Sequence, residues 1–143
     1  MTNPSLVIPD ALQPLLDLSK IIGKVGVPQE TLGLVRLRVS QINGRGIRIP
    51  SNPASGTADD RLLLVAGWRD ALDFTPAERA ALALAEAASR LSDGDDQVSD
   101  AVWDEAARHY NEEELAALIM QIGLVNLWNC VNVSTRQDPA DWN

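Results

Sequence analysis

Signals that start helices recur along this chain and constrain its fold more than any other feature. Thr75-Pro76-Ala77-Glu78 matches a capping box with proline at the first helical position. A second capping box combines Asn111 with Glu114 and precedes an apolar stretch that continues to about Val133. Because the first backbone N–H groups of a helix lack partners within the helix, these boxes predict where two helices begin.

Apolar residues recur at helical spacing throughout the chain, and no segment shows the alternation of a strand. A chain of 143 residues fits one domain. We therefore expect an all-α fold with five to six helices in a single domain over 1–143, with its core over about 8–137. The expected helices cover 10–22, 28–44, 59–72, 75–91, 99–110 and 111–133.

Charge and hydropathy exclude several classes of protein. The net charge of −8 argues against a general nucleic-acid binder, which normally presents a basic face. The apolar run at 62–67 is too short to cross a bilayer, and the first residues lack the positive charge of a signal peptide. We expect a cytoplasmic protein that contacts neither nucleic acid nor membrane.

The counts of cysteine and histidine limit the chemistry further. Cys130 is the single cysteine, so an intramolecular disulfide is excluded, and His109 is the single histidine. One of each gives no cluster of metal ligands, and the sequence has no glycine-rich phosphate loop. We expect neither a metal nor an organic cofactor, and we expect Cys130 to be a buried, inert thiol in the last helix.

Three separated stretches resemble the AhpD-like alkylhydroperoxidase and carboxymuconolactone decarboxylase family. They are LVRLRVSQING at 34–44, LLLVAGWRDALDFTPAERAALALAEA at 62–87 and NEEELAALIMQIGLVNLWNCVNV at 111–133. The resemblance implies an all-α fold and a homo-oligomer, which could be a dimer, a trimer or a hexamer. Apolar residues in the first, second and last expected helices exceed what one core needs, which also favours an oligomer.

The redox site of that family is missing from this sequence. Redox members carry Cys-x-x-Cys, a histidine four residues later and a glutamate twelve residues earlier. Counted from Asn43-Gly44, the two cysteine positions fall on Arg45 and Arg48. The histidine position falls on Asn52 and the glutamate position on Gly33. Since arginine is neither a nucleophile nor a proton shuttle near neutral pH, a thiol-dependent alkylhydroperoxidase is the least favoured function.

The backbone after Gly44 also departs from the family pattern. Pro50 and Pro53 follow Arg48 within five residues, among serine, asparagine and glycine. Each proline inside a helix costs about 3 kcal/mol, so two so close should abolish it. We predict a loop over 44–58.

A basic segment lies in this otherwise acidic chain. Residues 31–58 contain no Asp or Glu but carry Arg36, Arg38, Arg45 and Arg48. The segment therefore carries a charge of +4. The remaining residues carry −12, which gives the net charge of −8. Arginine forks bind carboxylate and phosphate, so Arg45 or Arg48 could hold an anionic group. Arg36 and Arg38 could instead form ion pairs within the fold or between subunits.

Other polar and aromatic residues leave alternatives open. Trp68 could belong to the core or form the wall of a pocket. Glu86 could pair with Arg90 on a solvated face or face the pocket. The asparagines at 126, 129 and 132 could line a cavity or satisfy one another at an oligomer contact, which we favour. The candidate ligand-binding residues are Arg45, Arg48, Asn52, Trp68 and Glu86.

Three classes of function follow. The favoured one is a protein that binds or transforms a small anionic metabolite by non-redox chemistry. The alternative is a catalytically silent scaffold or subunit that is retained for assembly. A thiol peroxidase comes last, because the chain has one cysteine.

Overall fold

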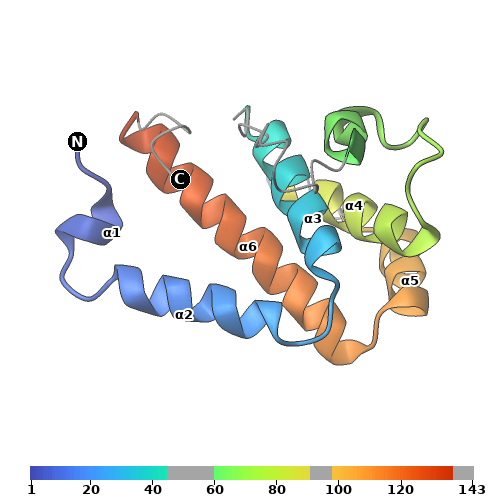
Figure 1. Ribbon diagram of the computed structural model, residues 1–143, viewed down its shortest axis with the longest axis horizontal. Helices are drawn as coiled ribbons and strands as arrows, with labels where there is room; N and C mark the ends of the chain where they lie inside the picture. Colours follow the sequence, from blue (N-terminus) through green and yellow to red (C-terminus); the bar gives the residue numbers. More distant parts are fainter. Residues whose placement is uncertain (45–59, 91–97, 137–143) are drawn as a thin grey trace.

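Helices account for the regular structure in the computed structural model, which describes residues 1–44, 60–90 and 98–136. No strand occurs in these three ranges. The fold is therefore all-α, as predicted (Figure 1). The elements are α1 (Pro4–Val7), α2 (Leu12–Gly23), α3 (Gln29–Ile42), the 3₁₀ helix η2 (Asp60–Gly67), α4 (Pro76–Ser89), α5 (Asp100–His109) and α6 (Glu112–Ser134).

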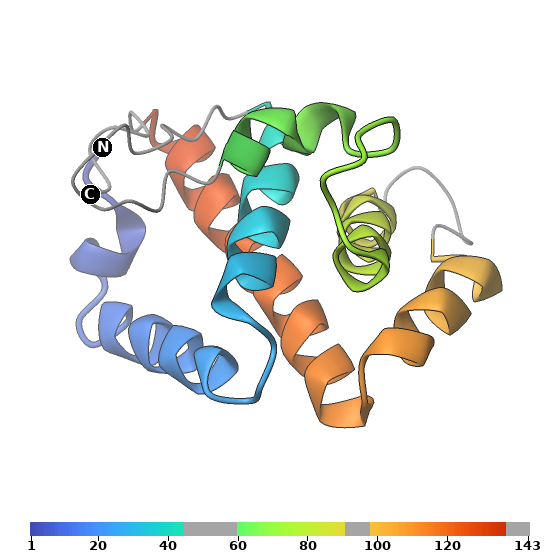
Figure 2. The ribbon, with the colours of Figure 1, turned by 45° about the vertical axis from the view of Figure 1, so that its right-hand side comes forward.

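Helix α3 lies between α6 and α4 in both views of the ribbon (Figures 1 and 2). α2 packs on α6, and α5 packs on α4. The main core lies where α3, α4 and α6 meet, and its fully buried side chains include Val35, Val39, Leu84 and Leu118. Burial of such a side chain contributes about 1.5–3 kcal/mol, so this junction fixes the relative positions of the three helices.

A second, smaller core lies between α3 and the segment around η2. It contains Leu34 and Leu37 of α3, Val65 of η2, Trp68 of the segment after η2, and Leu82 of α4. Because successive faces of α3 contribute to both cores, this helix is buried on two sides. Burial of Leu37 places the next residue, Arg38, on the part of α3 that lies close to η2 and α4.

Both predicted capping boxes are present. The Thr75 hydroxyl accepts from the Glu78 N–H at 3.1 Å, and the Glu78 carboxylate accepts from the Thr75 N–H at 2.9 Å. The second box closes in the same way at the start of α6, with distances of 2.9 and 3.0 Å. The first helix of the chain, α1, was not predicted. Its signal was present, because the Asn3 side chain caps the Ser5 N–H at 2.9 Å and Pro4 begins the helix.

The end of α3 also follows the sequence. Gly44 has a φ of 74°, the left-handed conformation that ends many helices and that glycine adopts at no steric cost. The N–H of Asn43 bonds to the carbonyl of Val39, and the N–H of Gly44 bonds to that of Gln41. The predicted stop of this helix is therefore confirmed. The loop predicted beyond Gly44 lies outside the described residues.

The helix predicted over 59–72 differs in type and length. It is a 3₁₀ helix, and it ends at Gly67. The Arg79 guanidinium donates to the carbonyls of Trp68 at 2.8 Å, Arg69 at 2.9 Å and Ala71 at 3.1 Å. The Trp68 carbonyl also accepts from the Ala71 N–H at 3.3 Å, so a side chain of α4 and a backbone turn together hold the segment after Gly67.

Helix α6 is long and apolar enough to cross a membrane, judged by length and composition alone. Its 23 residues nevertheless contribute to the core, with Leu115, Leu118, Ile122 and Val125 buried. It packs against α2, α3 and α4. A core helix of a helical protein passes the same test, and the expectation that this chain contacts no membrane stays a prediction.

Candidate functional site

The residues proposed from the sequence fall into two groups. Arg45, Arg48 and Asn52 lie outside the described residues, so their roles stay predictions. Trp68 and Glu86 are described, and the fold brings them into contact: the Trp68 indole N–H donates to Glu86 Oε1 at 2.8 Å. Both side chains are buried.

Gly33 occupies the position where the family resemblance places a glutamate. It lies inside α3, and a Cβ added there would meet no heavy atom within 4 Å. The helix therefore has room for a side chain at this position. Neither close packing nor an unusual φ requires glycine here.

We expect Gly33→Ala to raise the free energy of unfolding by about 0.5–1 kcal/mol, because alanine loses less backbone entropy than glycine in a helix. Urea denaturation measures the change. Gly26→Ala is the control of opposite sign, since Gly26 has a φ of 128° that alanine adopts only with strain. A lower free energy of unfolding for Gly33→Ala would contradict the conclusion that a side chain fits at this position.

Glu86 of α4 is the centre of a charged cluster that also includes Arg38 of α3 and Arg69 of the segment after η2. Its Oε1 accepts from Arg38 Nε of α3 at 2.8 Å, in addition to the Trp68 bond. Its Oε2 accepts from Arg69 Nη2 at 2.9 Å. The i+4 pairing with Arg90 considered from the sequence is therefore not formed. The partner of Glu86 could not be named from the sequence, because Arg38 lies 48 residues away along the chain.

The ionisation of Glu86 follows from these contacts. Burial by itself would raise the pKa of Glu86, but hydrogen bonds from Trp68, Arg69 and Arg38 and the charge of Arg38 outweigh it. The resulting pKa lies below the ordinary value of 4.5. Glu86 is thus a carboxylate at neutral pH, and it holds both guanidinium groups in place.

Trp68 provides a flat surface for two further contacts. The guanidinium carbon of Arg69 lies 4.4 Å from the centroid of the Trp68 ring, and that of Arg79 lies 5.3 Å away. Arginine over an aromatic face is attracted by the ring quadrupole. The indole is therefore fixed by its N–H bond and by both arginines, and the sequence alternatives for Trp68 resolve to a core position.

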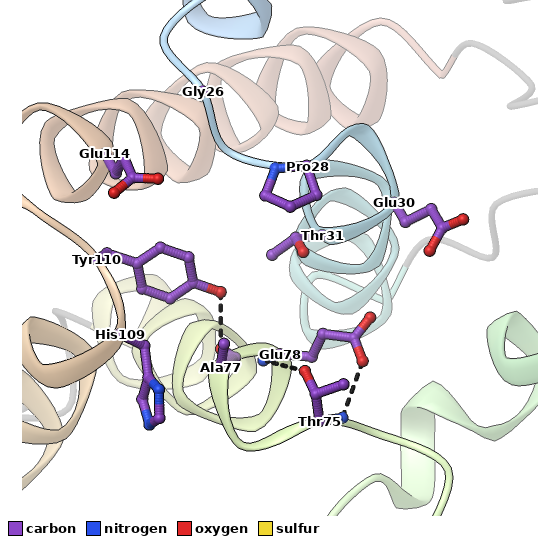
Figure 3. A pocket seen from close by; sticks show the side chains of 10 residues that line it. All are labelled: Gly26, Pro28, Glu30, Thr31, Thr75, Ala77, Glu78, His109, Tyr110 and Glu114. Carbon is purple, nitrogen blue, oxygen red and sulfur yellow. Dashed lines mark hydrogen bonds between the residues drawn. The ribbon is translucent and has the colours of Figure 1, made fainter.

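A second polar region lies where the N-terminal ends of α3 and α4 face the junction of α5 and α6. It is a hollow of about 380 Å³ (Figure 3). The ring of Tyr110 faces Thr31 across it, and glutamates at 30, 78 and 114 line it. These carboxylates would repel an anion, so the hollow does not suit the anionic ligand expected from the sequence.

Tyr110 is held as a neutral phenol beside this hollow. Burial raises the pKa of Tyr110 to about 12, the charges of Glu78 and Glu114 act in the same direction, and a hydrogen bond with Thr31 opposes them. Its hydroxyl donates to the carbonyl of Ala77 at 2.7 Å. The tyrosine therefore ties the α5–α6 junction to the start of α4.

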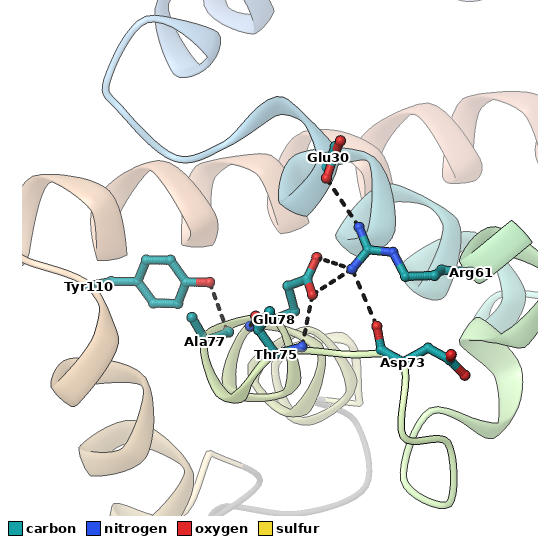
Figure 4. Close-up of polar contacts among 7 residues, drawn as sticks. All are labelled: Glu30, Arg61, Asp73, Thr75, Ala77, Glu78 and Tyr110. Carbon is teal, nitrogen blue, oxygen red and sulfur yellow. Dashed lines mark hydrogen bonds and ion pairs between the residues drawn. The ribbon is translucent and has the colours of Figure 1, made fainter. Parts of the chain in front are cut away.

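The carboxylate of Glu78 is engaged by Arg61 (Figure 4). Arg61 Nη1 lies 2.7 and 2.8 Å from the two oxygens of Glu78, and Nη2 lies 3.1 Å from Glu30 Oε2. Arg61 thus connects η2 with the first turns of α3 and α4. We interpret this region as a structural junction, because its charges satisfy one another.

Two of the asparagines of α6 make contacts within the chain, and the favoured oligomer contact stays a prediction. Asn126 accepts from Asn43 at 2.8 Å and donates to Ser89 at 3.3 Å. Asn129 contacts Ser40 at 3.4 Å. Among the described residues, Asn132 Oδ1 is buried without a hydrogen-bond partner.

The expectation that Cys130 is buried was wrong, and its inertness stays a prediction. The residue is exposed on α6, because it lies on the side of the helix that faces away from α3 and α4. Apolar residues occur on all sides of this helix, so the sequence does not show which side is exposed. No group of three or more His, Cys, Asp or Glu side chains in the described parts of the chain could hold a metal ion.

Known proteins show what this chain is similar to. No protein-family model matches it. It is 25% identical over 132 residues to the uncharacterised protein YdfG of Bacillus subtilis, covering 90% of this chain and 88% of YdfG. It is 41% identical over 70 residues to the uncharacterised protein YnjA of Escherichia coli, a match that covers 49% of this chain and 37% of YnjA.

One solved structure shows the fold. It is a protein of unknown function from Agrobacterium tumefaciens that has been suggested to be the antioxidant defence protein AhpD. The TM-score is 0.82 at 24% identity, and the match covers 95% of this chain and 94% of that chain. The chain therefore has the AhpD-like all-α fold that the resemblance implied.

Proposed function

We propose that this chain is an AhpD-like protein that binds or transforms a small anionic molecule by non-redox chemistry. The observation that carries the proposal is the acid-free segment 31–58, whose four arginines give +4 in a chain of net charge −8. An acidic remainder repels anions elsewhere and leaves this segment as the attractive region. Arg45 and Arg48, at the positions of the redox cysteines in the family resemblance, are the proposed ligands of the anion.

The cysteine content supports the non-redox part of this proposal. A dithiol peroxidase needs two thiols that form a disulfide during turnover, and this chain has one cysteine. That residue, Cys130, lies on the exposed side of α6.

A second candidate is a catalytically silent subunit that serves assembly. Exposed apolar side chains on α1, α2 and α6 favour it, since these helices present more apolar surface than one chain buries. The two candidates differ in their response to small anions. A silent subunit shows no saturable binding, whereas the favoured function requires it.

We expect saturable binding of small carboxylates or phosphate, and we expect Arg45→Gln/Arg48→Gln to weaken it about ten- to hundredfold. A charge-assisted hydrogen bond contributes roughly 1.5–3 kcal/mol, and about 1.4 kcal/mol corresponds to a factor of ten. Isothermal titration calorimetry measures the affinity. Arg90→Gln/Arg108→Gln is the matched control, because it removes the same charge from two exposed arginines outside the segment.

Two outcomes would contradict the proposal. The first is the absence of saturable binding to the wild-type protein, which would favour the silent subunit. The second is turnover of an alkyl hydroperoxide with a dithiol reductant that disappears in Cys130→Ser, which would establish thiol peroxidase chemistry instead.

A further inference from the structure

The two arginines on Glu86 retain unused hydrogen-bond donors. Arg38 spends Nε on Glu86 and Nη1 on Gln41, the latter at 3.2 Å. Arg69 spends Nη2 on Glu86. Within the described residues, Arg38 Nη2 and the Nε and Nη1 of Arg69 donate to no acceptor. An arginine fork has five N–H donors, so each guanidinium can bind a second oxyanion while it holds Glu86.

The cluster has a surplus of positive charge. Two guanidinium groups face one carboxylate, and the lowered pKa of Glu86 keeps that carboxylate ionised at neutral pH. Arg79 adds a further positive charge beside Trp68. Its Nη1 and Nη2 groups donate to backbone carbonyls, so we assign it a contribution of charge and no contact to the ligand. The surplus favours an anion in a protein whose net charge is −8.

Both guanidinium groups are fixed before any ligand arrives. Arg69 is held between the face of Trp68 and Glu86 Oε2, and Arg38 is held between Gln41 and Glu86 Oε1. A side chain that is already ordered loses less entropy on binding. Glu86 acts as a positioning residue, because it orients both arginines without touching the ligand.

The two arginines of the cluster differ in their exposure to solvent. The side chain of Arg69 is 64% exposed, and that of Arg38 is 14% exposed. A ligand can reach Arg69 from solvent, and Arg38, on the other oxygen of Glu86, offers a less hydrated contact. Screening is weaker at the inner position, where a charge-assisted hydrogen bond contributes more than on an open surface.

We propose that Arg38 and Arg69, joined through Glu86, form a receptor for the oxyanion of a small molecule, either a carboxylate or a phosphate. The inference rests on the proposed function and adds two described residues to its anion site. Arg38 belongs to the acid-free segment, and Arg69 lies outside it in sequence. The cluster therefore explains how an anion attracted by the segment is held by residues from two parts of the chain.

The test is a titration of the full chain with inorganic phosphate and, separately, with acetate. Binding is followed through the arginine Nε–Hε signals in ¹H–¹⁵N NMR spectra. Arg69→Gln should weaken binding about tenfold, and Arg69→Lys, which keeps the charge but loses the fork, should weaken it less. Arg108→Gln is the matched control, since Arg108 is also an exposed arginine paired with one glutamate. It should bind as the wild type does.

The outcomes separate this inference from the proposed function. If the wild type binds, Arg45→Gln/Arg48→Gln weakens binding and Arg69→Gln does not, the inference fails and the proposed function stands. Equal weakening by Arg69→Gln and Arg108→Gln would reduce the effect to net charge and also overturn the inference. No saturable binding of either anion to the wild type would overturn both. Tighter binding of one anion identifies the oxyanion that the receptor prefers.

Discussion

Glu86→Gln should lower the free energy of unfolding at pH 7 by about 2–4 kcal/mol. Removal of one partner from a buried ion pair costs about 3–5 kcal/mol, because the remaining charge is left uncompensated. Arg38 is the buried partner here, while Arg69 is largely exposed and reduces the expected cost. Glutamine has nearly the volume of glutamate, so the change isolates the charge from the packing around Trp68.

Urea denaturation of the two proteins measures this difference, with Glu105→Gln as the matched control. Glu105 also pairs with two basic side chains, Arg108 and His109, but this cluster lies on the surface of α5. Exposed pairs contribute about 0–1 kcal/mol, so the control should change little. Equal effects of the two substitutions would show that burial of the Glu86 cluster contributes nothing.

The contribution of Glu86 should depend on pH in a defined direction. Its pKa is lower in the folded protein than the ordinary value of 4.5, so the carboxylate form favours folding. The stabilisation is fully present above the pKa of the unfolded chain and is lost as pH falls through the lower pKa of the folded protein. The difference between wild type and Glu86→Gln should therefore shrink over this acidic range. A constant difference down to the acid transition would contradict the assignment.

The sequence predicted the parts of the fold that depend on local chemistry. Both capping boxes and the stop at Gly44 lie within a few residues of the elements they control, and all are formed. The helix expected from 99 is present as well, with Ser99 as its N-cap. The 3₁₀ form and the earlier end of η2 were missed, and the segment that follows it is held by Arg79 from the next helix. Local pattern cannot show a side chain that arrives from elsewhere in the fold.

The same distinction applies to the candidate site. Trp68 and Glu86 were selected from the sequence as separate residues, and the bond between them depends on the packing of α4 against the segment after η2. Arg69 was not selected, since an exposed arginine beside a tryptophan has no distinctive pattern. An ion pair within the fold was one alternative for Arg38, and the structure shows it, although its partner 48 residues away could not be named.

The exposed side of α6 leads to the second large effect. Four large apolar side chains, Ile119, Met120, Leu127 and Val133, are exposed there. Their spacing places them along one face of the helix. Leu6, Val7 and Ile8 near α1 and Leu16 and Ile21 of α2 are exposed as well. Single exposed apolar residues are common, but several on one face of a helix favour an interaction surface.

We propose that this face joins copies of the chain, and Leu127→Glu/Val133→Glu should raise the dissociation constant of the oligomer at least a hundredfold. Burial of one such apolar side chain contributes about 1.5–3 kcal/mol, and an unpaired carboxylate in its place adds a cost of desolvation. Multi-angle light scattering should give a wild-type mass that is a multiple of 15.5 kDa and a variant mass near 15.5 kDa.

Leu72→Glu is the matched control for this substitution. Leu72 is 98% exposed in the turn before α4, so a glutamate there should leave the mass unchanged. Dissociation by Leu72→Glu as well would assign the effect to added negative charge, since the chain already carries −8. A wild-type monomer at micromolar concentration would remove the interface altogether.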